Sequence, residues 1–216
     1  MKILVVAATK PEIQPLLMAI GSEAEGVCTY KGLQVEILIT GVGMTSTAFH
    51  LGKTLISSYD FALNFGIAGS FNRNLELGSV VNVVKDTFSE MGAESGNDFI
   101  PIAEMNLGVK NEILNNTITT NNAIHLLPKV FGITVNKVHG NEVSIQAVFN
   151  QFHPFTESME GAAFLMACEA QHIPCAQIRA ISNYVELRNR DAWNIPLAIT
   201  NLNNKALEIL HDFGSR

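Results

Sequence analysis

Short apolar runs alternate along the chain with segments in which apolar residues recur at helical spacing. Apolar runs of this kind between helical patterns are typical of the buried strands of a largely parallel sheet. We therefore predict strands over residues 3–8, 35–40, 61–65, 80–84, 133–138 and 175–182. The helical patterns predict helices over residues 10–20, 45–57, 161–172 and 195–213. The alternation indicates an α/β fold with a buried, mostly parallel sheet.

Residues 111–122 form the most polar stretch of the chain, which we expect to be an insertion, an exposed helix or a loop. We find no internal repeat, and no segment rich in proline, glycine or serine separates two parts of the chain. A length of 216 residues fits one α/β domain with a full core. We therefore predict a single domain over residues 1–216.

Composition and charge narrow the classes of function. With 47% hydrophobic and 16% charged residues, the chain has the composition of a folded globular protein. The net charge is −6, and the few, scattered Lys and Arg residues argue against a nucleic-acid-binding surface. The three cysteines lack metal-ligand spacing. No apolar run reaches the ~18 residues of a membrane span, and the N-terminal run is too short for a signal peptide, so we expect a cytoplasmic protein.

One carboxylate, Glu160, lies inside the otherwise apolar segment SMEGAAF at residues 158–164. Charged side chains are rarely buried without a partner. Two interpretations stay open: Glu160 forms a structural ion pair with Arg179, or it waits for a ligand that donates hydrogen bonds. Arg179 and Asn183 follow in the next apolar segment, and we expect both segments to contribute to one site. For Asn183 the alternative is a strand-end residue that bonds the local backbone.

Thr9 and Glu12 have the spacing of a capping box, in which the carboxylate bonds back to the N-cap residue of a helix. Glu12 also follows the first predicted strand, and open α/β sheets bind ligands at the carboxyl ends of their parallel strands. A carboxylate in that position is a candidate general base. We expect the two roles to be compatible only if Glu12 turns away from its own backbone.

Two glycine-containing segments also follow predicted strands. Residues 40–45 (TGVGMT) lead into a helix, where glycines let backbone N–H groups approach a ligand, although a tight turn without a ligand role is the alternative. Gly66, Ile67, Ala68 and Gly69 form a surface that a flat ring or a sugar can approach. For this second segment the alternative is a turn that requires positive φ angles.

In chain order, the segments AATKPE, TGVG, NFGIAG, SMEGA and RAISN resemble the nucleoside phosphorylase and nucleosidase family, which contains methylthioadenosine/adenosylhomocysteine nucleosidase. The resemblance covers nearly the whole chain. Within the family, SMEGAAF and SNYVE-x-RNR-x-x-W are similar to the futalosine hydrolases, which remove hypoxanthine from a nucleoside with an extended 5′ substituent on a route to menaquinone. The resemblance implies a nucleoside phosphorylase-like, three-layer α/β/α fold with a mostly parallel mixed sheet, no metal or cofactor, and a homodimer.

The resemblance also implies roles for the candidate residues. Glu160 would accept hydrogen bonds from the ribose hydroxyls, and Met159 would pack under the sugar. Glu12 would polarise the attacking water, and Arg179 would help to orient either this water or Glu160. The other implied contacts to the sugar, the base and the 5′ group are Gly66, Ile67, Ala68, Gly69, Val143, Ser144, Asn183, Arg188 and Arg190.

Two positions differ from the adenine-specific nucleosidases, which have Asp in place of Asn183 and Ser in place of Ile67. Their base-stacking aromatic residue is also absent, with Val143 near its place. An Asn amide can donate to O6 of a 6-oxopurine while its carbonyl accepts a proton carried on N7, so Asn183 favours hypoxanthine or guanine. Arg188 or Arg190 would supply a cation for a 5′ carboxylate, whereas their segment taken alone has the composition of a solvated loop.

A phosphorylase needs a site for a dianion, usually built from arginines or backbone donors. No arginine occurs in residues 7–12 or 41–46, where the phosphorylases of the family keep theirs, and Glu12 would repel phosphate. We therefore expect water as the nucleophile and a purine nucleoside as the substrate. The alternatives are an adenine-type nucleosidase, a purine nucleoside phosphorylase, or a nucleoside-binding protein without catalytic activity.

Overall fold

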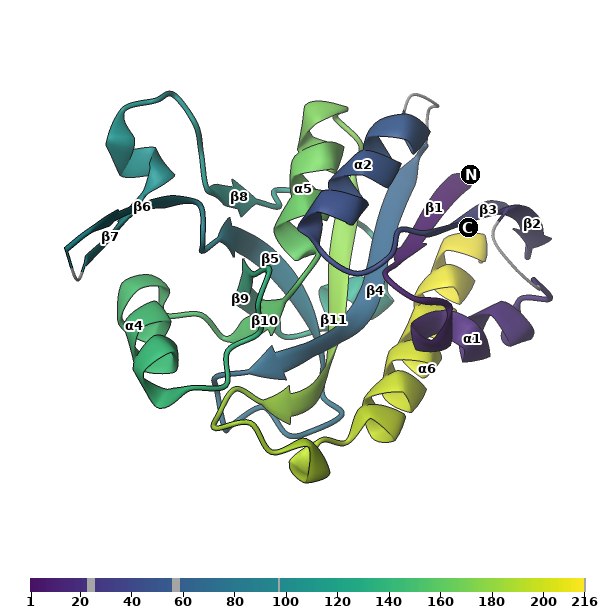
Figure 1. Cartoon of the computed structure of the whole chain (residues 1–216). Coiled ribbons are helices and arrows are strands. Elements are labelled where there is room, and N and C mark those ends of the chain that lie inside the picture. Colours follow the sequence, from purple (N-terminus) through teal and green to yellow (C-terminus); the bar gives the residue numbers. More distant parts are fainter. Residues whose placement is uncertain (23–25, 56–58, 97, 216) are drawn as a thin grey trace.

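The computed structural model describes residues 1–22, 26–55, 59–96 and 98–215, in which helices cover both faces of a mixed β-sheet (Figure 1). The large sheet contains β1 (Lys2–Ala7), β2 (Gly26–Tyr30), β3 (Leu33–Ile39), β4 (Phe61–Ser70), β5 (Val80–Phe88), β8 (Glu112–Leu114), β9 (Lys129–Thr134), β10 (Thr156–Ser158) and β11 (Cys175–Tyr184). A separate hairpin contains β6 (Gly92–Ser95) and β7 (Asp98–Pro101). The helices are α1 (Lys10–Ala19), α2 (Met44–Thr54), α3 (Asn122–His125), α4 (Glu142–Phe152), α5 (Gly161–Ala170) and α6 (Ile195–Gly214), with short 3-10 helices at Ile102–Met105 and Arg190–Ala192.

The strand order of the large sheet is β10-β9-β5-β11-β4-β1-β3-β2, and β8 pairs with β5. β1 is parallel to β3 and β4, β11 is parallel to β4, and β9 is parallel to β5 and β10. The pairs β2–β3, β5–β11 and β5–β8 are antiparallel. β10 also pairs antiparallel with β4, so β4, β11, β5, β9 and β10 form a closed ring of pairings. The predicted mostly parallel, mixed α/β sheet is confirmed.

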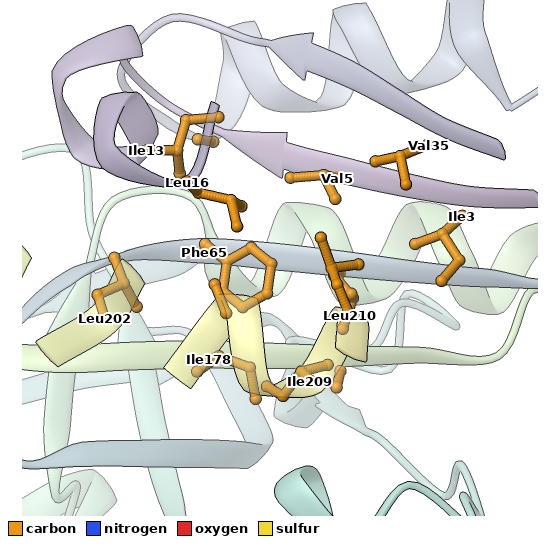
Figure 2. Close-up of a cluster of buried hydrophobic side chains, with 14 of the residues drawn as sticks. Ile3, Val5, Ile13, Leu16, Val35, Phe65, Ile178, Leu202, Ile209 and Leu210 are labelled. Carbon is orange, nitrogen blue, oxygen red and sulfur yellow. The ribbon is translucent and has the colours of Figure 1, made fainter. Parts of the chain in front are cut away.

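Both faces of the sheet are buried, as the continuous apolar strands predict. Ile3 and Val5 of β1 pack on one side with α1 and α6, in the cluster that Figure 2 shows. Leu4 and Val6 alternate with them and face a second cluster with α2 and α5. A strand covered on both faces needs apolar residues at every position rather than at every second one. No helix in the described ranges is long and apolar enough to cross a membrane.

Three predicted strands differ from the structure by more than two residues at one end or both. β4, predicted over 61–65, and β5, predicted over 80–84, both extend further toward their carboxyl ends. β9 begins and ends before the predicted 133–138. β11 supplies the backbone partners for the extension of β4, and β9 supplies those for the extension of β5. Such partners come from distant parts of the chain and leave no local apolar pattern.

The helical predictions differ at fewer places. α2 ends at Thr54, whereas the prediction extended over 45–57, of which residues 56 and 57 lie outside the described part of the chain. The polar stretch 111–122 contains the short strand β8, and its first and eleventh residues, Asn111 and Asn121, are buried. The Asn121 side chain donates to the Ile209 carbonyl of α6, which explains how an amide is accommodated inside the protein. α4 was not predicted.

The segment from Gly66 to Gly69 is part of β4, so the alternative interpretation of this segment, a turn with positive φ, is wrong. Neither glycine is among the residues with positive φ in the described chain. Gly66 is instead required by close approach, because a Cβ there would lie 2.0 Å from Nη1 of Arg179. A Cβ on Gly69 would lie 2.9 Å from the Val185 side chain and 3.1 Å from the Asn183 amide. The glycines leave room for side chains of β11.

Candidate active site

A pocket of about 350 Å³ opens at the carboxyl ends of the neighbouring parallel strands β1, β4 and β11. Residues that follow such strands gather at one edge of the sheet, where α/β proteins bind ligands. The first turn of α1, the junction of β10 and α5, and the start of α6 complete its walls. The predicted site residues that line it are Glu12, Ile67, Ala68, Gly69, Met159, Glu160 and Asn183.

Glu12 serves its helix and faces the pocket at the same time. Its Oε2 accepts hydrogen bonds from the Thr9 backbone N–H at 2.9 Å and from Thr9 Oγ1 at 2.8 Å, as in a capping box. Its Oε1 accepts from the Ile67 N–H at 3.3 Å. The expectation that Glu12 must turn away from its own backbone is therefore wrong, because the two oxygens divide the roles. Burial raises the pKa of Glu12 above its ordinary value of 4.5, which suits a general base.

Glu160 is buried at the N-cap position of α5, and its side chain makes no capping bond to that helix. Oε1 accepts a hydrogen bond from the Gly43 N–H at 3.1 Å, so the glycine segment before α2 does supply a backbone donor. Oε2 lies 3.7 Å from Nη1 of Arg179. The ion pair and the place in the pocket wall thus occur together. A carboxylate has about four acceptor positions, so Glu160 can still accept bonds from a ligand.

Arg179 is 1% exposed and lies beneath the pocket rather than in its wall. Its Nη1 passes against Gly66, and Oε1 of Glu12 lies 3.2 Å from the same point, where a Gly66 Cβ would be. One guanidinium therefore stands next to both candidate catalytic carboxylates, and its charge opposes the rise in the pKa of Glu12. The cation allows two acidic groups to share one pocket.

A buried polar network holds Arg179 in place. Its Nη2 donates to Asn64 at 2.6 Å, and its Nε donates to Oε1 of Gln177 at 3.1 Å. Nε2 of Gln177 in turn donates to Asp86 at 2.9 Å, and Thr134 Oγ1 donates to the same carboxylate at 2.9 Å. Burial raises the pKa of Asp86 to about 6. No local sequence signal marks this network, because Asp86 is separated from Gln177 by 91 residues and Asn64 from Arg179 by 115.

Asn183 follows an irregularity in the β11–β4 register that lies between Ile181 and Asn183. Bulges of this kind re-aim side chains. One amide hydrogen of Asn183 bonds the Tyr184 carbonyl at 3.0 Å, and its carbonyl accepts from Ser182 Oγ at 2.8 Å. The local backbone contact is thus present, and the residue also lines the pocket. One N–H and one lone pair of the amide stay available to a ligand.

Val143 and Ser144 do not line this pocket. They lie in the first turn of α4, where Val143 is 78% exposed and Ser144 Oγ donates to the Asn141 carbonyl at 3.0 Å. Asn141 caps this helix by accepting from the Val143 and Ser144 N–H groups. An Asn before an apolar helical pattern is the signal that would have predicted α4.

Arg188 and Arg190 lie in the exposed segment after β11, Arg190 at the start of a 3-10 helix, and neither is among the lining residues of the pocket. The guanidinium carbons are 5.5 Å and 5.9 Å from the ring centroid of Trp193, which is a pocket residue. Arg73, by contrast, is paired with Glu186. Both guanidinium groups therefore lie against one aromatic ring, and that ring itself lines the pocket.

His139 and Glu157 also line the pocket and were not among the residues predicted from the sequence. Glu157 accepts hydrogen bonds from the His139 backbone N–H at 3.0 Å and from its imidazole Nδ1. No local motif marks this pair, since it forms only when β10 comes next to the end of β9. Within the described ranges, no three His, Cys, Asp or Glu side chains gather as potential metal ligands.

Comparison with known proteins shows which proteins this chain resembles. The chain is 28% identical over 190 residues to a futalosine hydrolase from Thermus thermophilus, covering 85% of this chain and 84% of that protein. It is 26% identical over 175 residues to a futalosine hydrolase from Streptomyces coelicolor, covering 77% and 74%. A solved 5′-methylthioadenosine/S-adenosylhomocysteine nucleosidase from Campylobacter jejuni has the same fold, with a TM-score of 0.82, 20% identity and full coverage of both chains. Residues 2–213 match the phosphorylase superfamily, and this chain belongs to that family.

Proposed function

We propose that this protein hydrolyses the N-glycosidic bond of futalosine, releasing hypoxanthine and dehypoxanthine futalosine in menaquinone biosynthesis. The observation that supports this most directly is the pair Glu12 and Glu160 in one pocket beside Arg179, with Asn183 in the same wall. Relatives named futalosine hydrolase support the substrate. We also propose a single-domain, cytoplasmic enzyme that works as a homodimer, as the family resemblance implies.

Cleavage leaves negative charge on the purine while the ribose becomes cation-like, so the site must stabilise both. Glu12 takes a proton from the attacking water through Oε1, a role supported by the hydrogen bonds that keep Oε2 on Thr9 and leave Oε1 with the Ile67 N–H. Its raised pKa improves the match to a base that works near neutral pH. In this proposal Glu160 accepts hydrogen bonds from the ribose hydroxyls and Met159 packs beside the sugar, which their positions in the pocket lining support.

Asn183 supports a 6-oxopurine as the leaving group. Its free N–H can donate a hydrogen bond to O6, and the remaining lone pair of its carbonyl can accept a hydrogen bond from N7–H of the protonated base. Neither bond requires Asn183 to leave its contacts with Ser182 and Tyr184. Arg188 and Arg190 are proposed to hold the carboxylate of the 5′ extension at the rim.

Water is favoured over phosphate as the nucleophile. The loops at 7–12 and 41–46 contain no arginine. Arg73, the arginine after the glycine segment, is engaged with Glu186 and stacks on the Tyr184 ring. A phosphate dianion would instead meet the carboxylates of Glu12 and Glu160.

The test is incubation with futalosine, inosine and methylthioadenosine, with and without phosphate, while free base is measured. We expect phosphate-independent release of hypoxanthine and a kcat/KM for futalosine well above that for methylthioadenosine. A ratio near or below one would assign the protein to the adenine nucleosidases. Dependence on phosphate would indicate a phosphorylase, and binding without release of base would indicate a nucleoside-binding protein. Asn183→Asp should lower cleavage of the hypoxanthine nucleoside relative to the adenine nucleoside.

A further inference from the structure

The pair formed by His139 and Glu157 has no role in the mechanism above. Their side chains are only 10% and 3% exposed, yet both residues line the catalytic pocket. One carboxylate oxygen of Glu157 accepts from the backbone N–H of His139 at 3.0 Å, and the other bonds imidazole Nδ1. The imidazole ring is therefore held at Nδ1. The other ring nitrogen, Nε2, takes no part in the contact with Glu157.

The strand register places Glu157, the partner of His139, on the other side of Gly69 from Asn183. Glu157 of β10 pairs with Gly69 of β4, and Asn183 of β11 pairs with the same glycine from the other side. These strand ends adjoin in Figure 1. Residues directly opposite across a pair of strands have side chains on the same face. With strands about 4.8 Å apart, the outer residues Glu157 and Asn183 stand roughly 10 Å apart. The side chains of Val185 and Asn183 occupy the space that a Cβ of Gly69 would need, and Gly69, Glu157 and Asn183 all line the same pocket.

The hydrogen bond at Nδ1 determines what Nε2 can recognise. A carboxylate only accepts hydrogen bonds, so Nδ1 must carry the proton that it shares with Glu157. In the neutral imidazole, Nε2 is then an acceptor. A 6-oxopurine presents an N1–H donor next to O6, whereas a 6-aminopurine presents an unprotonated nitrogen at N1. The acceptor suits the first base and is repelled by the second.

We propose that His139 is a base-specificity residue that accepts the N1–H of a 6-oxopurine, and that Glu157 is the positioning residue that fixes its tautomer. The proposal rests on the proposed nucleosidase function and adds a second contact, on the other side of O6 from Asn183. Two independent contacts on adjacent parts of the base discriminate more strongly than one.

Glu157→Gln is the sharpest test, because the structure dictates how the amide must lie. The backbone N–H of His139 is always a donor, so the Gln carbonyl must face it and the NH2 group must face Nδ1. The imidazole then has to accept at Nδ1 and carry its proton on Nε2. This donor opposes N1–H of inosine and suits N1 of adenosine. We expect the ratio of kcat/KM for inosine over adenosine to fall by roughly tenfold or more, the scale of one hydrogen bond.

His139→Ala removes the acceptor without supplying a donor, so it should lower the same ratio by less than Glu157→Gln. The double variant should behave like His139→Ala, because the tautomer no longer matters without the ring. His125→Ala, at an exposed position on α3, is the matched control and should leave the ratio unchanged. Thermal unfolding of each variant checks that the fold is intact.

Binding of free bases to the unaltered protein tests the contact without turnover or substitution. Hypoxanthine should bind roughly tenfold or more tightly than 1-methylhypoxanthine, which lacks the N1–H. Equal affinities, or equal losses for inosine and adenosine in both variants, would overturn the proposal and make the pair structural. A loss for futalosine but not for inosine would also overturn it and place His139 at the 5′ group. If the protein binds hypoxanthine selectively but cleaves no 6-oxopurine nucleoside, the proposed function fails while this inference stands.

Discussion

Replacing Glu12 with glutamine separates the catalytic role of this side chain from its capping role. The carboxylate accepts two hydrogen bonds from Thr9 through one oxygen and one from Ile67 through the other. Glutamine has a single oxygen, and the two donors of Thr9 will hold it at the helix end. The amide NH2 then faces the Ile67 N–H, where two donors meet. We expect Glu12→Gln to lower the free energy of unfolding by about 1–3 kcal/mol, the usual effect of one unsatisfied polar group.

The kinetic effect of Glu12→Gln should be larger and of a different kind. Loss of a general base lowers turnover by ~10²-fold or more, equivalent to about 2.7 kcal/mol in the activation barrier. KM should change little, since Glu160 and Asn183 still hold the substrate. The assay is release of hypoxanthine under saturating futalosine, with protein concentration corrected for the folded fraction. Thr9→Val, which removes one capping bond and keeps the carboxylate, is the comparison variant and should lower kcat less than tenfold.

The pH dependence gives a second measure of the same group. Glu12 must be deprotonated to accept a proton, and burial raises its pKa above 4.5. Turnover of the wild-type protein should therefore fall as the pH drops through this raised pKa, and the acid limb should be missing in Glu12→Gln. Normal turnover by Glu12→Gln, or an unchanged acid limb, would refute the mechanism and leave Glu12 as a capping residue only.

Three further predictions concern the groups around Glu12. Glu160→Gln should reduce kcat/KM more for ribonucleosides than for 2′-deoxynucleosides, and equal reductions would indicate that the ion pair with Arg179 is purely structural. Asp86→Asn should remove a pH dependence of stability. Because the pKa of Asp86 rises from 3.8 to about 6 on folding, the unfolding free energy of the wild type should fall by about 2 kcal/mol between pH 4 and pH 6, and urea denaturation of both proteins measures this. Arg188→Ala and Arg190→Ala should raise KM for futalosine and leave inosine unaffected, and an equal effect on both substrates would contradict a contact with the 5′ carboxylate.

Local patterns in the sequence determined much of the fold. The apolar runs identified six strands of the sheet, and the spacing of Thr9 and Glu12 identified the start of α1. The position of Glu12 after the first strand predicted a ligand-binding place at the carboxyl edge of the sheet, and the segments of Glu160 and Asn183 were expected to contribute to one site; all three residues line the pocket. These features depend on residues a few positions apart, or on the general rule that parallel strands end at the same edge.

Only the tertiary structure decided which groups touch. The Gly66–Gly69 segment is a strand because β11 pairs with it, and no property of four small residues announces that partner. Glu160 meets the Gly43 N–H across a separation of 117 residues, and Gln177 meets Asp86 across 91. His139 faces the pocket because Glu157 holds its ring, and Val143 turns away because Asn141 starts a helix there. Side-chain direction at such positions follows from strand register and from distant hydrogen bonds, which a pattern of neighbouring residues does not contain.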